Sequence, residues 1–191
     1  INIIGNKSFS KKEILRVMSS GTKYFFEFWS SKDTYSSSVL RSDISKIENY
    51  YLNRGYVRFR ILSNQVNLSN DNQDIIITIN IDEGERYEFG DIKVYGNSVV
   101  SPEILKSSLM EVMLPKQTFS RQKIQESEKL LAYLLGDEGF AFPEVLSLPI
   151  IDDATKIVDV EFRVDPGQRS TVRRINITGN INTNDEVYRR E

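Results

Sequence analysis

The strongest constraint on this chain is a string of six residues that recurs three times. The copies stand at residues 1–6, 92–97 and 175–180, and each is an alternating apolar run that ends in Gly-Asn. Such a run is typical of a half-buried strand, and Gly-Asn suits a turn with positive φ. The copies are about 80 to 90 residues apart, so the sequence predicts a tandem array of small modules.

A helix-start signal follows each Gly-Asn pair. Residues 10–13 are Ser-Lys-Lys-Glu and residues 183–186 are Thr-Asn-Asp-Glu, and both match a capping box, in which the hydroxyl accepts from the third helical amide. Residues 101–102 are Ser-Pro, a helix cap followed by Pro at the first helical position. Each module is therefore expected to begin with a strand that leads into a helix.

A second helix is expected in both complete repeats. Apolar residues within 40–51, and again within 124–135, recur at spacings that place them on one helical face. Each helix is followed by a glycine, Gly55 or Gly139, and then by an aromatic residue. A glycine just past a helix supplies the left-handed conformation that commonly ends one.

Two strands are expected to close each module. In the first repeat, residues 57–61 alternate and residues 75–81 begin apolar on both faces, which favours the middle of a sheet for the latter. The segment 57–68 is then an edge strand. The second repeat follows the same order with strands at 145–151 and 157–164. The predicted fold is α+β, with β-α-α-β-β modules, each a three-stranded mixed sheet covered by two helices.

The repeats place the module boundaries at residues 1–85, 86–167 and 168–191, the last being the truncated start of a further module. The connections between modules are short, which predicts beads on a stiff, hinged string. The chain begins at Ile1 already inside a strand-like run, so we interpret it as a piece of a longer protein.

The composition excludes much chemistry. The chain has no Cys and no His, which rules out thiolate nucleophiles, zinc sites built on those residues, and any Ser-His-Asp triad. The remaining carboxylates form no recognisable pair, so we predict no enzyme activity, no catalytic residue, no metal site and no cofactor. The net charge of -2 argues against nucleic-acid binding. No stretch approaches the roughly 18 apolar residues that span a bilayer.

Several motifs together resemble a known family. They are the helix exit at residues 50–56 (Tyr-Tyr-Leu-Asn-Arg-Gly-Tyr), the strand exit Glu83-Gly84, residues 139–143 (Gly-Phe-Ala-Phe-Pro) and residues 172–175 (Val-Arg-Arg-Ile). With the strand-Gly-Asn openings, they resemble the POTRA (polypeptide-transport-associated) domains of outer-membrane protein assembly factors. The resemblance covers essentially the whole chain and aligns it with the third, fourth and start of the fifth of five such domains.

The resemblance implies a location and partners. It implies a periplasmic arm at the outer membrane, tethered to a membrane barrel that is missing from this sequence. Such an arm receives unfolded outer-membrane β-barrel proteins and holds accessory lipoproteins of the assembly complex. It also implies that a β-propeller lipoprotein docks on the first module.

The edge strand of the first module is the first candidate binding site. An edge presents unpaired backbone groups, to which an extended chain can add by β-augmentation. The corresponding strand of the second module carries Pro143 and Pro149, each of which removes a donor and protects the edge. An open edge could equally be an edge without function. The residues predicted to bind partners are Val57, Arg58, Phe59, Arg60 and Ile61.

An aromatic loop is the second candidate site. Residues 24–29 include five aromatics and the only Trp of the chain. Aromatic residues anchor interfaces well, and the third POTRA domain of the family has a similar loop. We therefore expect Phe28, Trp29 and the neighbouring residues 30–32 to contact a partner. The alternative is that these rings cap the core beneath a long loop between helices.

Proteins with other functions share parts of this pattern. Within the same family, the arm of a related translocase or of a cell-division protein would show similar modules. A KH-like nucleic-acid-binding module shares part of the topology but needs a GxxG loop between its helices, and residues 19–24 hold one Gly. A gel shift that depends on salt would identify such a module.

Overall fold

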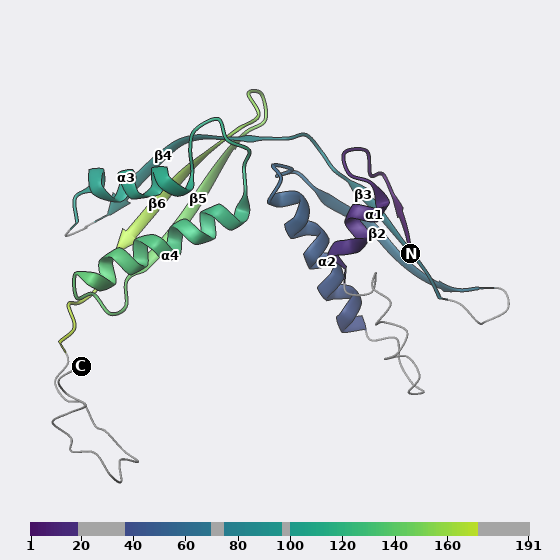
Figure 1. Ribbon diagram of the computed structural model, residues 1–191, viewed down its shortest axis with the longest axis horizontal. Coiled ribbons are helices and arrows are strands. Elements are labelled where there is room, and N and C mark those ends of the chain that lie inside the picture. Colours follow the sequence, from purple (N-terminus) through teal and green to yellow (C-terminus); the bar gives the residue numbers. More distant parts are fainter. Residues whose placement is uncertain (19–36, 70–74, 97–99, 172–191) are drawn as a thin grey trace, which may run out of the picture.

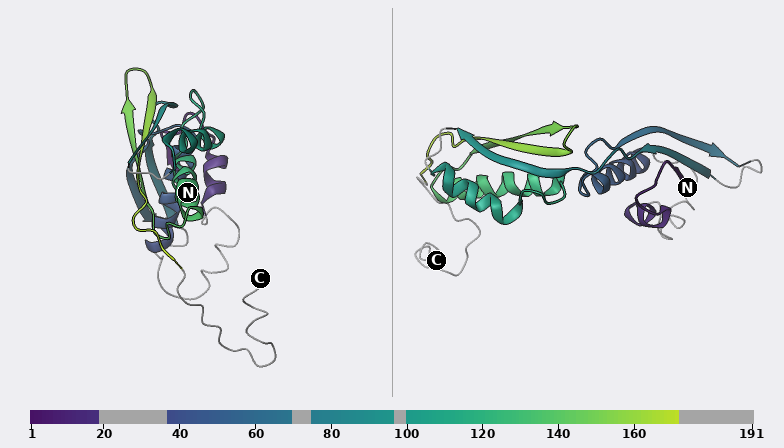
Figure 2. Two further views of the ribbon diagram at one scale, coloured as in Figure 1. Left: turned by 90° about the vertical axis from the view of Figure 1, so that its left-hand side faces the viewer. Right: turned by 90° about the horizontal axis from the view of Figure 1, so that it is seen from above.

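The computed structural model consists of two modules arranged end to end (Figure 1). It describes residues 1–18, 37–69, 75–96 and 100–171, so the aromatic loop and the third repeat string lie outside the described residues. In each module the sheet lies on one side and the helices on the other, and both sheets lie on the same side of the molecule (Figure 2). No helix within these ranges is long and apolar enough to cross a membrane.

The first module contains a sheet and two helices in the predicted order. Its elements are β1 (Asn2–Ile4), α1 (Lys11–Val17), α2 (Ser37–Leu52), β2 (Arg60–Leu68) and β3 (Ile75–Asp82). The sheet order is β1-β3-β2, with β1 parallel and β2 antiparallel to β3. The apolar strand β3 is therefore central, as predicted, because it is the only one of the three with neighbours on both sides.

The second module repeats this architecture. Its elements are β4 (Glu88–Gly96), α3 (Pro102–Val112), α4 (Arg121–Asp137), β5 (Glu144–Asp152) and β6 (Ile157–Asp165). The sheet order is β4-β6-β5, again with one parallel and one antiparallel pair. Each module buries its own apolar cluster between sheet and helices. The predicted α+β fold with two mixed three-stranded sheets is confirmed.

The first helix cap and the turn glycines have the conformations that the sequence predicts. The Ser10 side chain accepts from the Glu13 amide, and Glu13 reaches back to the Ser10 amide at 2.8 Å, which completes the capping box. Gly5 and Gly96 both have positive φ, and a Cβ on either would lie about 2 Å from a carbonyl oxygen of the neighbouring strand. Glycine is therefore required where the first strand of each module ends.

Two strand limits differ from the prediction. The strand β2 begins at Arg60, not at residue 57, because the chain first turns after α2, with the Phe59 amide donating to the Tyr56 carbonyl at 3.1 Å. The strand β4 begins at Glu88, earlier than residue 92. The preceding residue Tyr87 and the strand's start pair with residues 116–119, which cover the outer side of this end of β4.

Candidate functional site

The five residues predicted as a docking edge are placed at the junction between the modules and in the first core. Val57 packs against the apolar core of the second module. Arg58 donates to both carboxylate oxygens of Asp153, at 3.0 and 2.7 Å, and Asp153 lies in the turn between β5 and β6. Neither residue belongs to a strand, which corrects the predicted edge.

The other three residues lead into the sheet. Phe59 is only 8% exposed and stacks on Tyr51, with ring centroids 4.2 Å apart. Arg60 forms an ion pair of 2.8 Å with Asp82 of β3, and Ile61 packs against the first core. Arg60 and Ile61 are the first residues of β2, which pairs with β3 on one side only and is an edge of the sheet.

A bulge interrupts the pairing of β2 with β3 just after Ile61. The register to β3 shifts between Ile61 and Ser63, which leaves Leu62 without a partner in β3 and 62% exposed. From Ser63 to Leu68 the strand pairs with β3 on one side only. Among the described residues, no side chain bonds to the backbone of residues 63–67. Within the described part of the chain, the donors and acceptors on the outer side of this segment have no partner.

The matching edge of the second module is closed. The Ser147 amide of β5 donates to Oε1 of Glu128 at 3.1 Å, and the Ser147 hydroxyl donates to the same oxygen. Two residues further on, Pro149 has no amide to offer. Because outward-facing residues alternate along an antiparallel edge, these positions close two consecutive sites. The sequence pointed to Pro149, but Glu128 from α4 was missed because only the tertiary structure brings it to this edge.

Backbone and helix-end contacts connect the two modules. The Tyr87 amide donates to the Gly55 carbonyl at 2.8 Å. The Asn53 side chain, just after α2, accepts from the Gln122 amide in the first turn of α4 at 2.8 Å. A helix N-terminus has amides without partners in its own helix, so Asn53 acts as a cap supplied by the neighbouring module.

Asp153 is the electrostatic centre of this junction. Besides Arg58, it accepts a hydrogen bond from the Tyr87 hydroxyl. The hydrogen bonds from Arg58 and then from Tyr87 lower the pKa of Asp153 to about 2. Nearby, Lys156 forms an ion pair with Glu85 of the connector. The turn between β5 and β6 therefore binds the end of the first module through charge.

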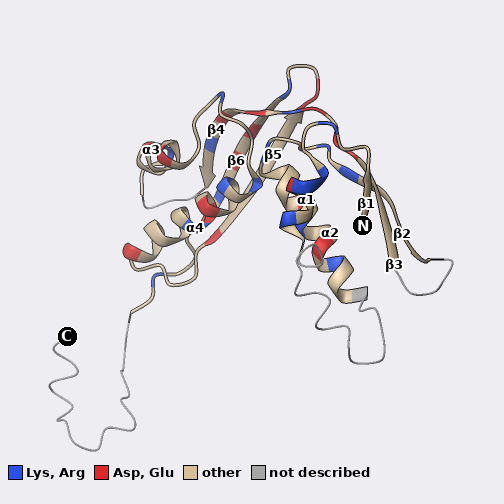
Figure 3. Cartoon of the chain, turned by 45° about the vertical axis from the view of Figure 1, so that its right-hand side comes forward, with Lys and Arg blue, Asp and Glu red and all other residues tan. Residues whose placement is uncertain are grey.

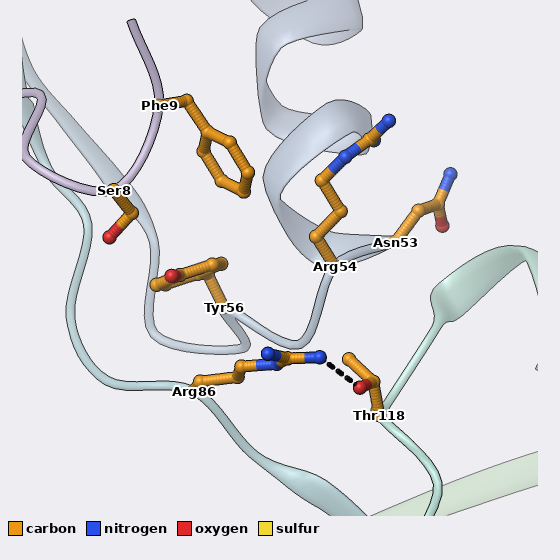
Figure 4. A pocket seen from close by; sticks show the side chains of 7 residues that line it. All are labelled: Ser8, Phe9, Asn53, Arg54, Tyr56, Arg86 and Thr118. Carbon is orange, nitrogen blue, oxygen red and sulfur yellow. Dashed lines mark hydrogen bonds between the residues drawn. The ribbon is translucent and has the colours of Figure 1, made fainter.

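An open cleft of about 450 Å³ lies beside the junction (Figure 4). Phe9 and Tyr56 form part of the wall of the cleft. Arg86 of the connector donates a hydrogen bond to the Thr118 hydroxyl. Arg54 lies over the Tyr50 ring at 3.6 Å. The lining of the cleft contains no acidic residue. The full lining is Ser8, Phe9, Asn53, Arg54, Tyr56, Arg86 and Thr118.

The charged residues of both modules bear on the nucleic-acid-binding and metal-binding alternatives. Lys and Arg alternate with Asp and Glu along the described elements of both modules (Figure 3). Within the described ranges, no three acidic side chains gather into a group that could hold a metal ion. Phe28 and Trp29, the other candidate binding residues, lie outside the described residues.

The fold defines a class of modular scaffold in which two α+β modules lie in series. Each module has a mixed three-stranded sheet, and an edge strand follows its second helix. The family model named POTRA, described as "Surface antigen variable number repeat", matches residues 1–84 and 87–167. The chain belongs to the POTRA family, as the motifs at the helix and strand exits had indicated.

Known relatives place the chain more closely. It is 29% identical over 191 residues to the outer membrane protein assembly factor BamA of Neisseria meningitidis serogroup B, covering all of this chain and 24% of that protein. It is 31% identical over 193 residues to BamA of Buchnera aphidicola, again over the whole chain and 31% of that protein. The chain thus spans about a quarter to a third of the length of these relatives.

A solved structure has the same arrangement of modules. The crystal structure of POTRA domains 3–5 of Haemophilus influenzae BamA superimposes with a TM-score of 0.75 at 27% identity. The match covers 99% of this chain and 73% of that one. The similarity extends over both modules, and the aligned domains agree with the third-to-fifth assignment that the sequence motifs suggested.

Proposed function

We propose that this chain is part of the periplasmic arm of an outer-membrane protein assembly factor of the BamA type. In this role it acts as a scaffold without catalytic activity. It receives unfolded outer-membrane β-barrel proteins and carries accessory lipoproteins, and it is tethered to a barrel in the membrane. The observation that supports this most strongly is the whole-chain similarity to BamA proteins together with an open sheet edge in the first module.

The proposed contact for a barrel protein is the outer side of β2, from Ser63 to Asn67. Backbone hydrogen bonds tolerate many side chains, which suits a receiver of many different strands. The second module offers no comparable edge at β5, because Glu128 and Pro149 close it. Client strands are therefore expected to add to the first module.

The aromatic loop is the proposed contact for a β-propeller lipoprotein. Its support is the concentration of aromatic residues in 24–29, including Phe28 and Trp29, on the module that resembles the third POTRA domain. Substitution of Trp29 by Ala should weaken capture of such a lipoprotein without changing the melting of either module.

The test of the edge is a pair of proline substitutions, Gln65→Pro and Val66→Pro. Neighbouring residues of an antiparallel edge point their amides in opposite directions, so one substitution breaks the bond to β3 and the other removes only an outward donor. The binding probe is a peptide with the alternating pattern of a barrel strand, titrated into isotope-labelled protein. The variant that keeps its fold should lose the peptide-induced shifts of residues 63–67.

The control is Glu161→Gln, a substitution of a half-buried residue on the central strand of the second sheet, away from β2. It should leave peptide binding as in the parent. If the folded proline variant binds the peptide as tightly as the parent does, the proposed edge is wrong.

A further inference from the structure

The basic side chains near the junction differ in their partners. Arg58 and Lys156 both form ion pairs. Arg54 and Arg86, which line the cleft beside the junction, have no carboxylate within ion-pair distance among the described residues. The nearby Glu13 carboxylate is bonded within its capping box instead. The cleft therefore carries positive charge that the described part of the chain does not pair.

Both arginines of the cleft are already held in place. Arg54 donates to the Tyr50 carbonyl at 3.0 Å and lies over the ring of the same residue, and Arg86 donates to the Thr118 hydroxyl. A guanidinium has several N–H donors, and within the described residues each of these two uses one. The cleft thus presents oriented donors, and binding would cost the arginines little side-chain freedom.

Aromatic rings form another wall of the cleft. Phe9 and Tyr56 are half-buried, with ring centroids 5.6 Å apart. Phe9 also meets two tyrosine rings of α2 edge-on, at 5.1 and 5.2 Å, so this wall is fixed by packing. In Figure 4 both rings lie to the left of Arg54, and Arg86 lies below them.

A second cleft at the junction shows a contrast. It has a volume of about 480 Å³ and is lined mainly by polar residues of α2 and α4, which include both Arg121 and Glu48. Its lining thus contains an acid as well as an arginine, and it contains no aromatic ring. The first cleft differs in both respects, so it combines unpaired positive charge with apolar rings.

We propose that the first cleft binds a segment of another polypeptide in which an acidic side chain stands next to an aromatic one. The carboxylate accepts hydrogen bonds from Arg54 and Arg86, because the planar fork of Arg fits a carboxylate. The aromatic side chain packs on Phe9 and Tyr56. The strand β2 takes no part in this site, so the cleft can fail its test while the proposed contact at β2 stands, and the reverse.

A ligand in this cleft contacts both modules at once. The lining includes residues of the first module, Arg86 of the connector and Thr118 of the second module. A ligand that binds only the docked arrangement of the modules stabilises that arrangement. The Tyr87 amide, which donates to the Gly55 carbonyl across the junction, should therefore exchange more slowly when the ligand is bound.

The test uses the isotope-labelled chain and a short peptide with blocked termini that carries glutamate next to phenylalanine. Titration with this peptide should shift the amide signals of Phe9, Tyr56 and Thr118. At a peptide concentration of about nine times Kd, exchange at the Tyr87 amide should slow about tenfold, because most docked molecules then carry peptide and cannot open. A matched peptide with glutamine in place of glutamate should bind at least about tenfold more weakly.

The double variant Arg54→Gln, Arg86→Gln removes both guanidinium groups and should also weaken binding at least about tenfold. Exchange at β3 and β6 amides reports whether each module stays folded. If the double variant loses its fold, Arg86→Gln alone carries the test, because Arg86 belongs to no helix or strand. Arg163→Gln is the matched control, since it makes the same change at an exposed arginine of β6 outside the cleft, and it should bind as the parent does.

Equal binding of the two peptides, or equal binding by the folded arginine variants and the parent, would overturn the proposal. An equal loss in Arg163→Gln would do so as well, because it would show attraction by net charge alone. Shifts centred on residues 63–67 would place the peptide at β2 and not in the cleft. Inorganic phosphate that reproduces the shifts at the cleft would show an anion site that has no need of an aromatic side chain, which also contradicts the proposal.

Discussion

The Tyr51 hydroxyl donates a hydrogen bond of 2.8 Å to the Glu83 carboxylate, joining the end of α2 to the end of β3. Glu83 is 6% exposed and also accepts from the Lys7 and Ser8 amides, at 3.0 Å each. The second module lacks this buried acid, because Pro166 stands at the corresponding strand exit. The first module therefore depends on a polar network where the second does not.

We predict that Tyr51→Phe destabilises the first module by about 1–3 kcal/mol, because the substitution leaves a buried carboxylate short of one donor. Urea unfolding followed through the amide signals of the first module measures this change. Tyr50→Phe removes a neighbouring hydroxyl that makes no hydrogen bond among the described residues, and should have little effect. Equal losses from both substitutions would contradict the role of the network.

The same network predicts that the stability of the first module depends on pH. Burial by itself would raise the pKa of Glu83, but hydrogen bonds from Ser8, Tyr51 and two amides outweigh burial and hold the pKa below its ordinary value. Stability from this group is therefore fully present above the ordinary pKa of 4.5 and is lost as pH falls through the lowered one. Glu83→Gln should reduce this loss of stability at low pH. Unfolding curves of the first module, measured at several pH values, give the change in the free energy of unfolding.

A direct titration tests the junction at Asp153. Carboxyl signals should show Asp153 titrating near pH 2 in the parent and closer to its ordinary value of 3.8 in Arg58→Ala. The junction contact is then complete above the ordinary pKa and weakens as pH falls toward 2. Arg60→Ala removes a different ion pair, with Asp82, and should leave the Asp153 titration as it is. An unshifted midpoint in Arg58→Ala would show that another group sets this pKa.

The outer side of β5 should become available for pairing when Glu128 and Pro149 are both replaced. Glu128→Ala, Pro149→Val restores outward donors at residues 147 and 149, and unprotected edges pair with other strands. We expect faster hydrogen exchange at Ser147 and self-association at high concentration, detected by sedimentation. Glu126→Ala, a substitution of the same kind on the same helix, is the control. A double variant that stays monomeric and retains slow exchange at Ser147 would mean that other groups protect the edge.

Two glycines of the second module should respond in opposite ways to alanine. Gly96 has a φ of 130°, and a Cβ there would lie 2.0 Å from the Val164 carbonyl oxygen. Gly96→Ala should therefore lower the free energy of unfolding by about 1–3 kcal/mol. Gly136 lies within α4 with open space around a Cβ, so Gly136→Ala should stabilise by about 0.5–1 kcal/mol. Unfolding followed at β6 amides compares the two. Destabilisation by Gly136→Ala would show a constraint on α4 that its surroundings do not explain.

Features that depend on neighbours in the sequence could be predicted from the sequence. The capping box at Ser10, the turn glycines and the central position of residues 75–81 all follow from short patterns, because each reflects the conformation or burial of a few consecutive residues. The repeat then extended these assignments from the first module to the second. Strand limits were less accurate, as the start of β2 at Arg60 shows.

By itself, the sequence determined the module, its order of elements and its repetition, because alternation, helix caps and glycines act locally. The tertiary structure decided which backbone groups stay free. Glu128 reaches Ser147 from another element, and Arg58 meets Asp153 from another module, 95 residues away in the chain. Such pairs form only when packing brings distant segments together. For that reason Val57 and Arg58, which looked like part of an open edge, proved to lie at the junction between the modules.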